Sequence, residues 1–593
     1  MRSKIISSFI NLIVLALLLI GWQSVLAKVN PVADSIVLDV ECAGGRMGRG
    51  KCPQGYELGL TGTISLAHLD NVSTSNEHYI EHKRVVDLAL GGSPEYGYDA
   101  KDAVDIWYKT NNPAYLTFAI EGADSYVTSE EALIAGGSAA NIANDSYLYV
   151  GPKLTKIALL YGMAYDQLTA GQRTRWAAYA EQVIFNVWNN SQAEWGGNSH
   201  TWSGWATNNP NNNYYFSFAM ATSLWALASG NQIWLDKMNN EIIPALNTAY
   251  ASIVGGGSIE GTGYGEALKN LFRLYHFWKS GTSASIDQGH NHTKESIDYM
   301  IHLTTPDFAA VTPIGDVARS SYMTIFDYET QLVLSAAALY PTSPEAARAR
   351  WYAGNVTIPS GVGWKAREYL YDTTGVSTAP TALSYFAQTT GVYLAPSSWT
   401  PSAMLAAFKA GELIESHAHQ DMGSVSLYKL GWLTVTGNRG SNGIKQSTDR
   451  HNIVRFERSG SILPQARDTP SAITPSDNAG THTVVMDMSN LYSDSDITQW
   501  TRTAVFNGTT LTIDDVTVTD AAVTPIFQLN TDTLPIQTGN TITAGSLQIQ
   551  INTPASPTVV IESWQTDIAS DSNQHYRISI SGGANFSIVL SEV

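Results

Sequence analysis

The sequence contains few cysteines, few charged residues and a deficit of basic side chains. Cys42 and Cys52 are the only cysteines among 593 residues, and Asp, Glu, Lys and Arg together make up 15%. Two cysteines are too few for a cysteine-based zinc cluster. They would close one small loop in an oxidising compartment, or else stay as two free thiols. Because 34 basic residues face 52 acidic ones, the formal net charge is −18, which argues against nucleic acid as a partner.

Long apolar runs are also missing after the first 27 residues. Arg2 and Lys4 precede an apolar run over residues 5–20, and Val-Leu-Ala at 25–27 follows it. This order is typical of a secretory signal peptide, which we predict over residues 1–27. A retained membrane anchor is the alternative, although the run is short for a bilayer span. The mature chain is thus predicted to be secreted or periplasmic, with no integral membrane span after cleavage.

The first half of the remaining chain has helical spacing. Between about residues 80 and 375, apolar residues recur every three to four positions, as on the face from Leu154 to Leu168. Thr169 and Gln172 have the spacing of a capping box, which predicts a helix start. Further predicted helices cover residues 216–227, 266–279, 294–303 and 328–339.

After about residue 384 the apolar period becomes two. The segment TLTIDDVTVTD at 510–520 alternates, as do LQIQI at 547–551 and the last residues of the chain. Thr, Ser and Val are abundant here, as they are in strands. The sequence therefore predicts an α+β multidomain fold, with helices over residues 28–383 and an antiparallel β domain over residues 384–593.

A polar loop at 198–215, NSHTWSGWATNNPNNNYY, separates two helical stretches. It places His200, Trp202 and Trp205 beside three consecutive asparagines. An indole beside Asn and His suits the C–H face of a sugar ring, so Trp202 and Trp205 are candidate substrate-binding residues. Anchoring of the loop is the alternative for both tryptophans.

Two further segments concentrate reactive side chains. The first, GGGSIEGTGYGE, holds Glu260 and Tyr264 in a glycine-rich loop that leads into a helix. The second runs from ESHAHQDMG through GWL and contains His417, His419 and Asp421. His451 follows in DRHNIV.

Together these segments resemble the heparinase II/III-like polysaccharide lyases. The resemblance rests on the Asn-rich helix start, the Glu-x-x-x-Tyr loop, PIGD at 313–316, and the H-x-H-x-D, GWL and HN elements. It covers roughly residues 190–455. It implies an incomplete (α/α) toroid over 28–383, a β-sandwich over 384–593, and β-elimination of uronic-acid-containing polysaccharides. The acidic substrate would be alginate or a glycosaminoglycan.

The resemblance also assigns catalytic roles. Elimination removes the C5 proton beside a uronate carboxylate, and amide donors on that carboxylate stabilise the transition state. Asn212 and Asn213 are the candidate donors, and Tyr264 matches the catalytic tyrosine that acts as acid. Where the family commonly has histidine, this chain has Tyr214. The base is therefore His200, Tyr214 or its neighbour Tyr215, or Tyr264 itself.

Nitrogen and carboxylate ligands near the strand segment predict a metal site. His419, Asp421 and His451 are candidate ligands for a structural zinc ion, although Thr436 stands where the family often has an acidic residue. Hydrogen bonding at the domain interface is the alternative, with one histidine, His417, lining the substrate site.

The remaining candidates are substrate contacts. Tyr215 and Glu260 are assigned to substrate binding; Glu260 orients Tyr264 or a sugar hydroxyl, or else caps its turn. Arg319 would contact a substrate carboxylate, unless it pairs with Asp316.

Two other functions compete with a lyase. A glycoside hydrolase on a helical toroid needs two carboxylates across the scissile bond, and Glu260 with Asp316 is the one pair available. An exported protein that binds glycans without cleaving them needs neither the carboxylate pair nor the Tyr264 phenol.

Overall fold

The computed structural model describes residues 63–593, except for 266, 317–324, 326, 357–370, 413–416, 437–438, 441–442, 494 and 565–573. The predicted signal peptide, both cysteines and Arg319 lie outside the described residues. Within the described residues, we find no helix with the length and apolar character that a membrane crossing requires.

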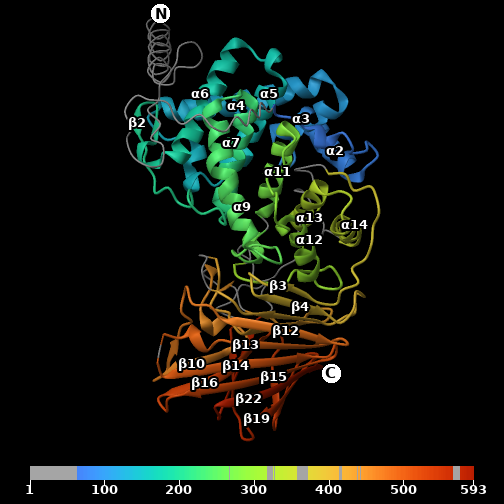
Figure 1. Ribbon diagram of the computed structural model, residues 1–593, viewed down its shortest axis with the longest axis vertical. Helices are drawn as coiled ribbons and strands as arrows, with labels where there is room; N and C mark the ends of the chain where they lie inside the picture. The colour runs from blue at the N-terminus through green and yellow to red at the C-terminus, as the bar shows by residue number, and fades with distance from the viewer. Residues whose placement is uncertain are drawn as a thin grey trace, which may run out of the picture.

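Helices occupy the first part of the chain (Figure 1). They are α2 (Glu77–Leu90), α3 (Ala100–Thr110), α4 (Pro113–Ala135), α5 (Val150–Met163), α6 (Ala170–Trp188), α7 (Asn213–Ser229), α8 (Gln232–Lys237), α9 (Ile243–Ala251), α10 (Thr262–Gly265), α11 (Leu268–Thr282), α12 (His292–Leu303), α13 (Asp327–Leu339) and α14 (Pro344–Asn355). The predicted capping box is confirmed: Thr169 caps α6, and its side chain accepts from the Gln172 N–H at 3.2 Å.

Helices α5 and α7 lie side by side and run in the same direction. Near their starts the Gly151 N–H donates to Ser217 Oγ at 2.8 Å, and near their ends Gly162 packs against Ala228. A side chain at Gly151 would place its Cβ 2.8 Å from the Ser217 carbonyl oxygen, so glycine is what allows this close approach.

Helices α11 and α13 continue the same direction. Gly281 near the end of α11 packs against Leu227 near the end of α7. Arg273 donates to Gln331 at 2.7 Å, and Lys279 donates to the Leu339 carbonyl at 3.0 Å, so α13 is parallel to α11. The N-termini of α5, α7, α11 and α13 consequently share one end of the helical part.

Antiparallel sheets form the second part of the chain. The first sheet has the order β3-β4-β5-β6-β7: β3 (Tyr385–Ala387), β4 (Val392–Pro396), β5 (Leu405–Lys409), β6 (Ser424–Tyr428) and β7 (Trp432–Thr434). An eight-stranded sheet has the order β12-β13-β14-β15-β22-β19-β18-β17: β12 (Ala472–Asn478), β13 (Thr481–Asp487), β14 (Ile497–Phe506), β15 (Thr510–Thr519), β22 (Asn585–Glu592), β19 (Leu547–Thr553), β18 (Thr541–Ala544) and β17 (Ile536–Thr538). A third sheet has the order β11-β10-β16-β21-β20: β11 (Ser461–Leu463), β10 (Val454–Arg458), β16 (Val523–Thr531), β21 (Tyr576–Ser581) and β20 (Thr558–Ser563). Two-residue pairs complete the strands: β1 (Glu194–Trp195) with β2 (Asn198–Ser199), and β8 (Arg439–Gly440) with β9 (Gly443–Ile444).

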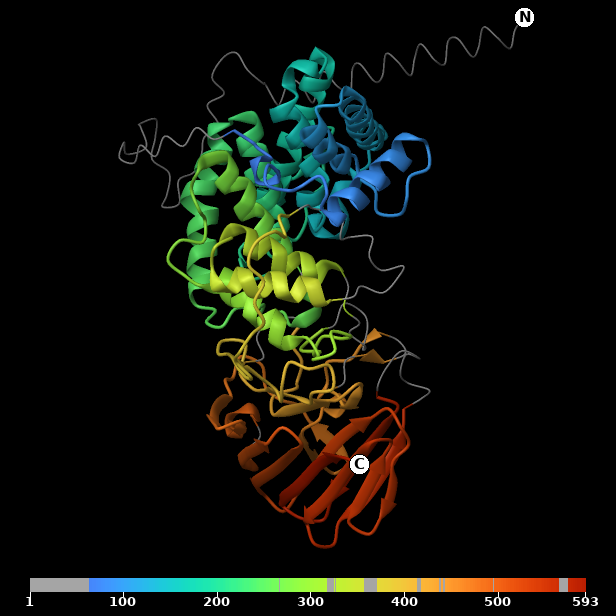
Figure 2. The ribbon, with the colours of Figure 1, turned by 90° about the vertical axis from the view of Figure 1, so that its right-hand side faces the viewer.

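The first sheet is a middle layer between the helices and the eight-stranded and third sheets. In β4, Val392 and Leu394 pack into the core of the helical part, whereas Tyr393 and Ala395 pack into the core of the other sheets. Side chains of a strand alternate between its two faces, so one sheet serves both cores. Figures 1 and 2 show β3 and β4 between the helices and the strands of the eight-stranded and third sheets.

The predicted order of helices followed by antiparallel sheets is confirmed. The period-two segment at 510–520 forms β15, and the first strand of the middle layer begins at Tyr385. The domain boundary between residues 383 and 384, the toroid and the two-sheet sandwich stay predictions.

Candidate active site

The glycine-rich loop before α11 is held tightly between the two parts of the chain. Gly261 has a φ of +90°, and a Cβ there would lie 2.3 Å from the Ile314 carbonyl oxygen. The Thr262 N–H donates to that carbonyl at 2.6 Å, and the Gly263 N–H donates to the Asp316 carbonyl at 3.0 Å. These backbone contacts fix the next residue, Tyr264.

The Tyr264 ring stacks on the imidazole of His417. The ring centroids are 3.6 Å apart and the planes are tilted by 12°. Tyr264 belongs to α10 in the helical part, whereas His417 lies between β5 and β6 of the middle sheet. The site therefore lies where the two parts meet, which agrees with the alternative interpretation of these histidines as interface residues.

Asp316 fixes the orientation of two histidines. Its Oδ2 lies 2.7 Å from His417 Nδ1, and its Oδ1 lies 2.7 Å from His419 Nε2 and 3.1 Å from Gln446 Nε2. Burial raises the pKa of Asp316, but hydrogen bonds from His417 and His419 outweigh burial and lower it to about 2. An ionised carboxylate can only accept, so both imidazole nitrogens carry the protons that they donate.

Glu260 links His417 to the start of α7. Its carboxylate is completely buried and lies 3.9 Å from His417 Nε2. One oxygen accepts from Asn212 Nδ2 at 2.9 Å, and the other accepts from the Asn213 N–H at 2.8 Å. A carboxylate at a helix N-terminus is favourable, because unpaired N–H groups and the helix dipole point toward it.

The two asparagines consequently differ in what they can offer a ligand. Asn212 is held on both sides of its amide: its Oδ1 accepts from the Tyr214 N–H at 3.1 Å, and its Nδ2 donates to Glu260. In Asn213 the backbone N–H is used, but the buried Oδ1 has no hydrogen-bond partner among the described residues. Since Oδ1 can only accept, this orphan atom does not test the predicted role of Asn213 as a donor to the substrate, which stays a prediction; Asn212 caps α7 and holds Glu260.

Comparisons with known proteins bear on this arrangement. No protein-family model matches the chain, and no curated protein matches it. Among solved structures, heparan sulfate lyase HepC from Pedobacter heparinus matches with a TM-score of 0.57 and 13% identity, covering 89% of this chain and 86% of that one. A heparinase III structure matches with a TM-score of 0.57 and 12% identity, covering 90% of this chain and 87% of the other. The chain has a heparinase-like fold. The predicted resemblance is confirmed at the level of the fold.

In this heparinase-like fold, the tyrosines after Asn213 face different surroundings. The Tyr214 hydroxyl donates to Asp145 Oδ1 at 2.8 Å. Burial, the Asp145 carboxylate and the nearby Tyr264 all raise the pKa of Tyr214. Tyr215 instead packs in the core, where its ring and that of Trp188 lie edge to face with their centroids 5.8 Å apart. Tyr215 is buried in α7, which favours a packing role, and its predicted contact with substrate stays a prediction.

The polar loop before α7 is only partly available to a ligand. The Trp202 indole N–H donates to the Asn186 carbonyl at 2.8 Å and its ring packs on Tyr147, contacts that favour loop anchoring. Trp205 is 48% exposed, and its contact with a sugar ring stays a prediction. The backbone N–H of His200 donates to the Ala193 carbonyl at 2.8 Å. The buried Nε2 of its imidazole has no hydrogen-bond partner among the described residues.

The predicted zinc ligands do not converge on one point. His419 Nε2 is engaged by Asp316, and His451 Nδ1 lies 2.8 Å from Thr436 Oγ1. Burial raises the pKa of Asp421 and lowers that of His451. Within the described part of the chain, His419, Asp421 and His451 do not bring three ligand atoms within 4.8 Å of one another. Zinc binding stays a prediction, and no step of the chemistry depends on it.

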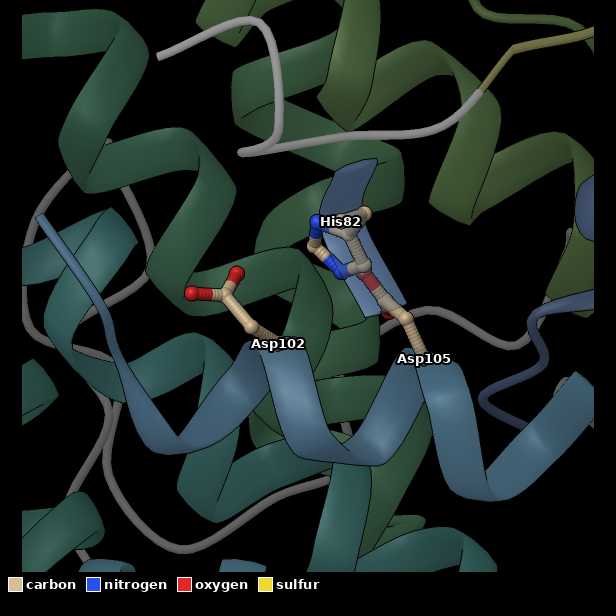
Figure 3. Close-up of side chains that lie close together, drawn as sticks. All are labelled: His82, Asp102 and Asp105. Atoms are coloured by element: carbon tan, nitrogen blue, oxygen red, sulfur yellow. Dashed lines mark ion pairs between the residues drawn. The ribbon is translucent and has the colours of Figure 1, made fainter. Parts of the chain in front are cut away.

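A different group of residues does meet that spacing. His82 from α2 lies beside Asp105 on α3, with Asp102 one turn away (Figure 3). The Lys101 ammonium lies 2.7 Å from Asp105 and 3.7 Å from Asp102, so the chain supplies its own positive charge there. We interpret this group as a buried ion-pair network rather than a metal site.

Sequence reasoning missed one residue beside the site. Asp145 precedes α5 by five residues and reaches Tyr214 because α5 and α7 begin at the same end. No motif surrounds it, since Asn-Asp-Ser is an ordinary turn sequence. The one signal is structural: Asp145, Ser146 and Tyr147 have φ values of 49°, 50° and 63°.

Proposed function

We propose that this chain is a lyase that cleaves a uronate-containing glycosaminoglycan by β-elimination. The observation that carries the proposal is the stacked pair of Tyr264 and His417, joined through Glu260 to the Asn213 end of α7. A phenol, an imidazole and an amide are the groups that such an elimination uses. The heparinase-like fold supports this reaction class, because one solved neighbour is named a heparan sulfate lyase and another is named heparinase III.

The reaction begins at the uronate carboxylate. The Asn213 amide donates to this carboxylate, and the charge that accumulates as C5 loses its proton is stabilised there. The positive ends of α5, α7 and α11 point to the same end of the molecule, which favours an anion. Neutral donors suit this task because they do not themselves give up a proton.

Tyr264 then serves as both base and acid. Its phenolate oxygen takes the C5 proton, the C4–O bond breaks as the C4–C5 double bond forms, and the same phenol returns the proton to the leaving oxygen. His417 stacks against this ring and holds it in place. Tyr214 is a poor base, because its hydroxyl already donates to Asp145 and its pKa is raised.

The hydrolase alternative is disfavoured by the state of its two carboxylates. Glu260 is completely buried and holds the start of α7, and Asp316 is buried between His417 and His419. A hydrolase needs two carboxyl groups that face each other across the scissile bond.

The proposed location of the enzyme is secreted or periplasmic, through the predicted signal peptide at residues 1–27.

The test is a substrate panel with an optical readout. β-Elimination creates a double bond conjugated to the carboxylate, which absorbs ultraviolet light, whereas hydrolysis yields reducing ends without new absorbance. Unsulfated and sulfated chondroitin, heparosan, heparan sulfate and alginate would be offered to the wild type and to Tyr264→Phe. We expect new absorbance with a glycosaminoglycan, and a loss of about 10²- to 10⁴-fold in kcat for Tyr264→Phe.

Tyr96→Phe is the matched control, because Tyr96 is 79% exposed and lies in the turn between α2 and α3. It should leave turnover unchanged. Full turnover by Tyr264→Phe would refute the assigned role of the phenol. Reducing ends without absorbance would point to a hydrolase, and neither product from any polymer would point to a glycan-binding protein.

A further inference from the structure

The short 3-10 segment η2 (Asn141–Tyr147) lies beside the candidate site. It leads directly into α5, which runs parallel to α7 with Gly151 bonded to Ser217. The residues before α5 and those before α7 therefore come together at the same end of the molecule. This placement brings Asp145 to Tyr214, 69 positions later in the chain.

The backbone of η2 is strained where it presents Asp145. Asp145, Ser146 and Tyr147 are three consecutive non-glycine residues with positive φ. Each such residue costs about 1–2 kcal/mol relative to the right-handed region. The buried Tyr147 ring, 5.1 Å from that of Trp202, anchors the far end of this turn. A turn that is strained yet anchored often marks a functional position.

Asp145 is an exposed carboxylate held against Tyr214, the residue after Asn213. Its Oδ1 accepts from the Tyr214 hydroxyl at 2.8 Å, and the neighbouring Asn213 N–H donates to Glu260, which lies 3.9 Å from His417, the ring on which Tyr264 stacks. A substrate unit seated at Tyr264 would thus meet a fixed negative charge. A carboxylate accepts hydrogen bonds from sugar hydroxyls, whereas a sulfate ester offers no donor and carries like charge.

We propose that Asp145 is a specificity-determining residue that selects an unsulfated uronate polymer and repels a sulfated one. The inference rests on the proposed function, and it narrows the substrate class of the same site. Discrimination arises from the repulsive element as much as from the attractive one. With like charges about 4 Å apart at a partly exposed site, binding of the unsulfated and sulfated substrates should differ by about 10- to 100-fold.

The experiment compares matched polymers with and without sulfate. Binding of chondroitin and chondroitin sulfate oligosaccharides, and of heparosan and heparan sulfate oligosaccharides, is measured by calorimetry, and kcat/KM is measured on the polymers. The variant is Asp145→Asn, which still accepts from Tyr214 through its amide oxygen but carries no charge. We expect the wild type to prefer unsulfated ligands, and Asp145→Asn to reduce that preference about tenfold or more, mainly by improving binding of the sulfated ligand.

Asp70→Asn is the matched control. Asp70 is an exposed carboxylate that accepts from the Tyr108 hydroxyl at 2.7 Å, and it follows η1 (Ala67–Leu69), away from Tyr214. It should leave the preference unchanged. A wild type that prefers sulfated ligands, or an equal preference in wild type and Asp145→Asn, would overturn the role of Asp145.

The binding arm separates this inference from the proposed function. A preference for unsulfated ligands that Asp145→Asn abolishes, without any turnover, would support the role of Asp145 while refuting the lyase. Turnover with ultraviolet absorbance but no effect of Asp145→Asn would refute the specificity role alone. Binding to none of the oligosaccharides would overturn both.

Discussion

At the scale of single residues, one buried carboxylate controls the geometry of the site. Asp316 accepts from His417, His419 and Gln446, and of these His417 stacks on the Tyr264 ring. Its low pKa keeps it ionised throughout the pH range in which the protein would work. Because it acts through His417 rather than on the substrate, Asp316 is a positioning residue.

Replacing Asp316 with Asn tests this role. An amide offers one acceptor oxygen and one NH₂ group, so either His417 or His419 would face a donor instead of an acceptor. Loss of a hydrogen bond to a charged group costs about 1.5–3 kcal/mol, or about 10- to 100-fold in rate. We expect kcat to fall by that factor with KM little changed, as measured by ultraviolet product formation.

Gln446→Ala is the control for Asp316→Asn. It removes the third donor to the same carboxylate at 3.1 Å but leaves both histidine bonds, and it should reduce kcat by much less. Asp316→Asn with unchanged kcat and a changed melting temperature would show that the carboxylate serves only the fold.

The sequence revealed single residues unevenly. Tyr264, His417 and Glu260 sit within motifs, and the structure brings them together. Tyr214 and Tyr215 could not be told apart from the sequence, because adjacent helical residues point in different directions and only packing shows that Tyr215 enters the core. Asp145 was invisible, since its proximity to Tyr214 depends on how α5 and α7 pack.

At the scale of elements, the glycine-rich loop positions the Tyr264 phenol. Gly261 has a φ of +90°. A Cβ atom added there would meet a backbone oxygen, which cannot move aside as a flexible side chain can. A loop with such a contact can admit a side chain only by shifting, and Tyr264 is three residues away. Local shifts near reacting atoms reduce rate strongly even when the fold survives.

Gly261→Ala is therefore expected to lower kcat/KM by about 100-fold or more. Gly289→Ala is a closely matched control, because Gly289 has a φ of +89° and nothing within 4 Å of its would-be Cβ. Both variants should lose about 1–2 kcal/mol of stability from the left-handed backbone, as measured by chemical denaturation. If both variants kept the same activity, the loop contact would not be what positions Tyr264.

Element boundaries followed the local signals where these existed. The capping box at Thr169 gave a correct helix start, whereas the helix predicted over 216–227 begins at Asn213 and ends before Gly230, whose φ is +66°. Helices α8 and α9 were not predicted as separate elements. Their apolar faces pack against neighbours rather than following one clear period, so tertiary contacts decide them.

At the scale of the whole molecule, the middle sheet joins the two parts around the site. From the sequence, β4 could be recognised only by its period of two. Which core each face of β4 enters depends on the layering of the sheets, which Figures 1 and 2 show. The same layering brings residues 260–264 and 417–419 together across more than 150 positions. Sequence periodicity places helices and strands but not such a junction, which the family resemblance alone indicated.

The net charge of the whole molecule gives a last prediction. The chain carries a formal charge of −18, and the proposed substrate is a polyanion, so the long-range field opposes their encounter. Salt shortens the reach of that field from about 30 Å at 0.01 M to about 8 Å at 0.15 M. The attraction exerted by the helix N-termini and the Asn213 amide acts at contact distance and is screened much less.

We therefore expect KM for an unsulfated uronate polymer to fall by about two- to fivefold as ionic strength rises over that range, while kcat stays constant. A short uronate oligosaccharide carries fewer charges and should show a weaker effect, which makes it the internal control. An enzyme that captured its substrate mainly with cationic side chains would show the opposite sign, with KM rising as salt is added. A rise in KM would therefore refute the interpretation that neutral donors and helix ends, rather than basic residues, hold the substrate carboxylate.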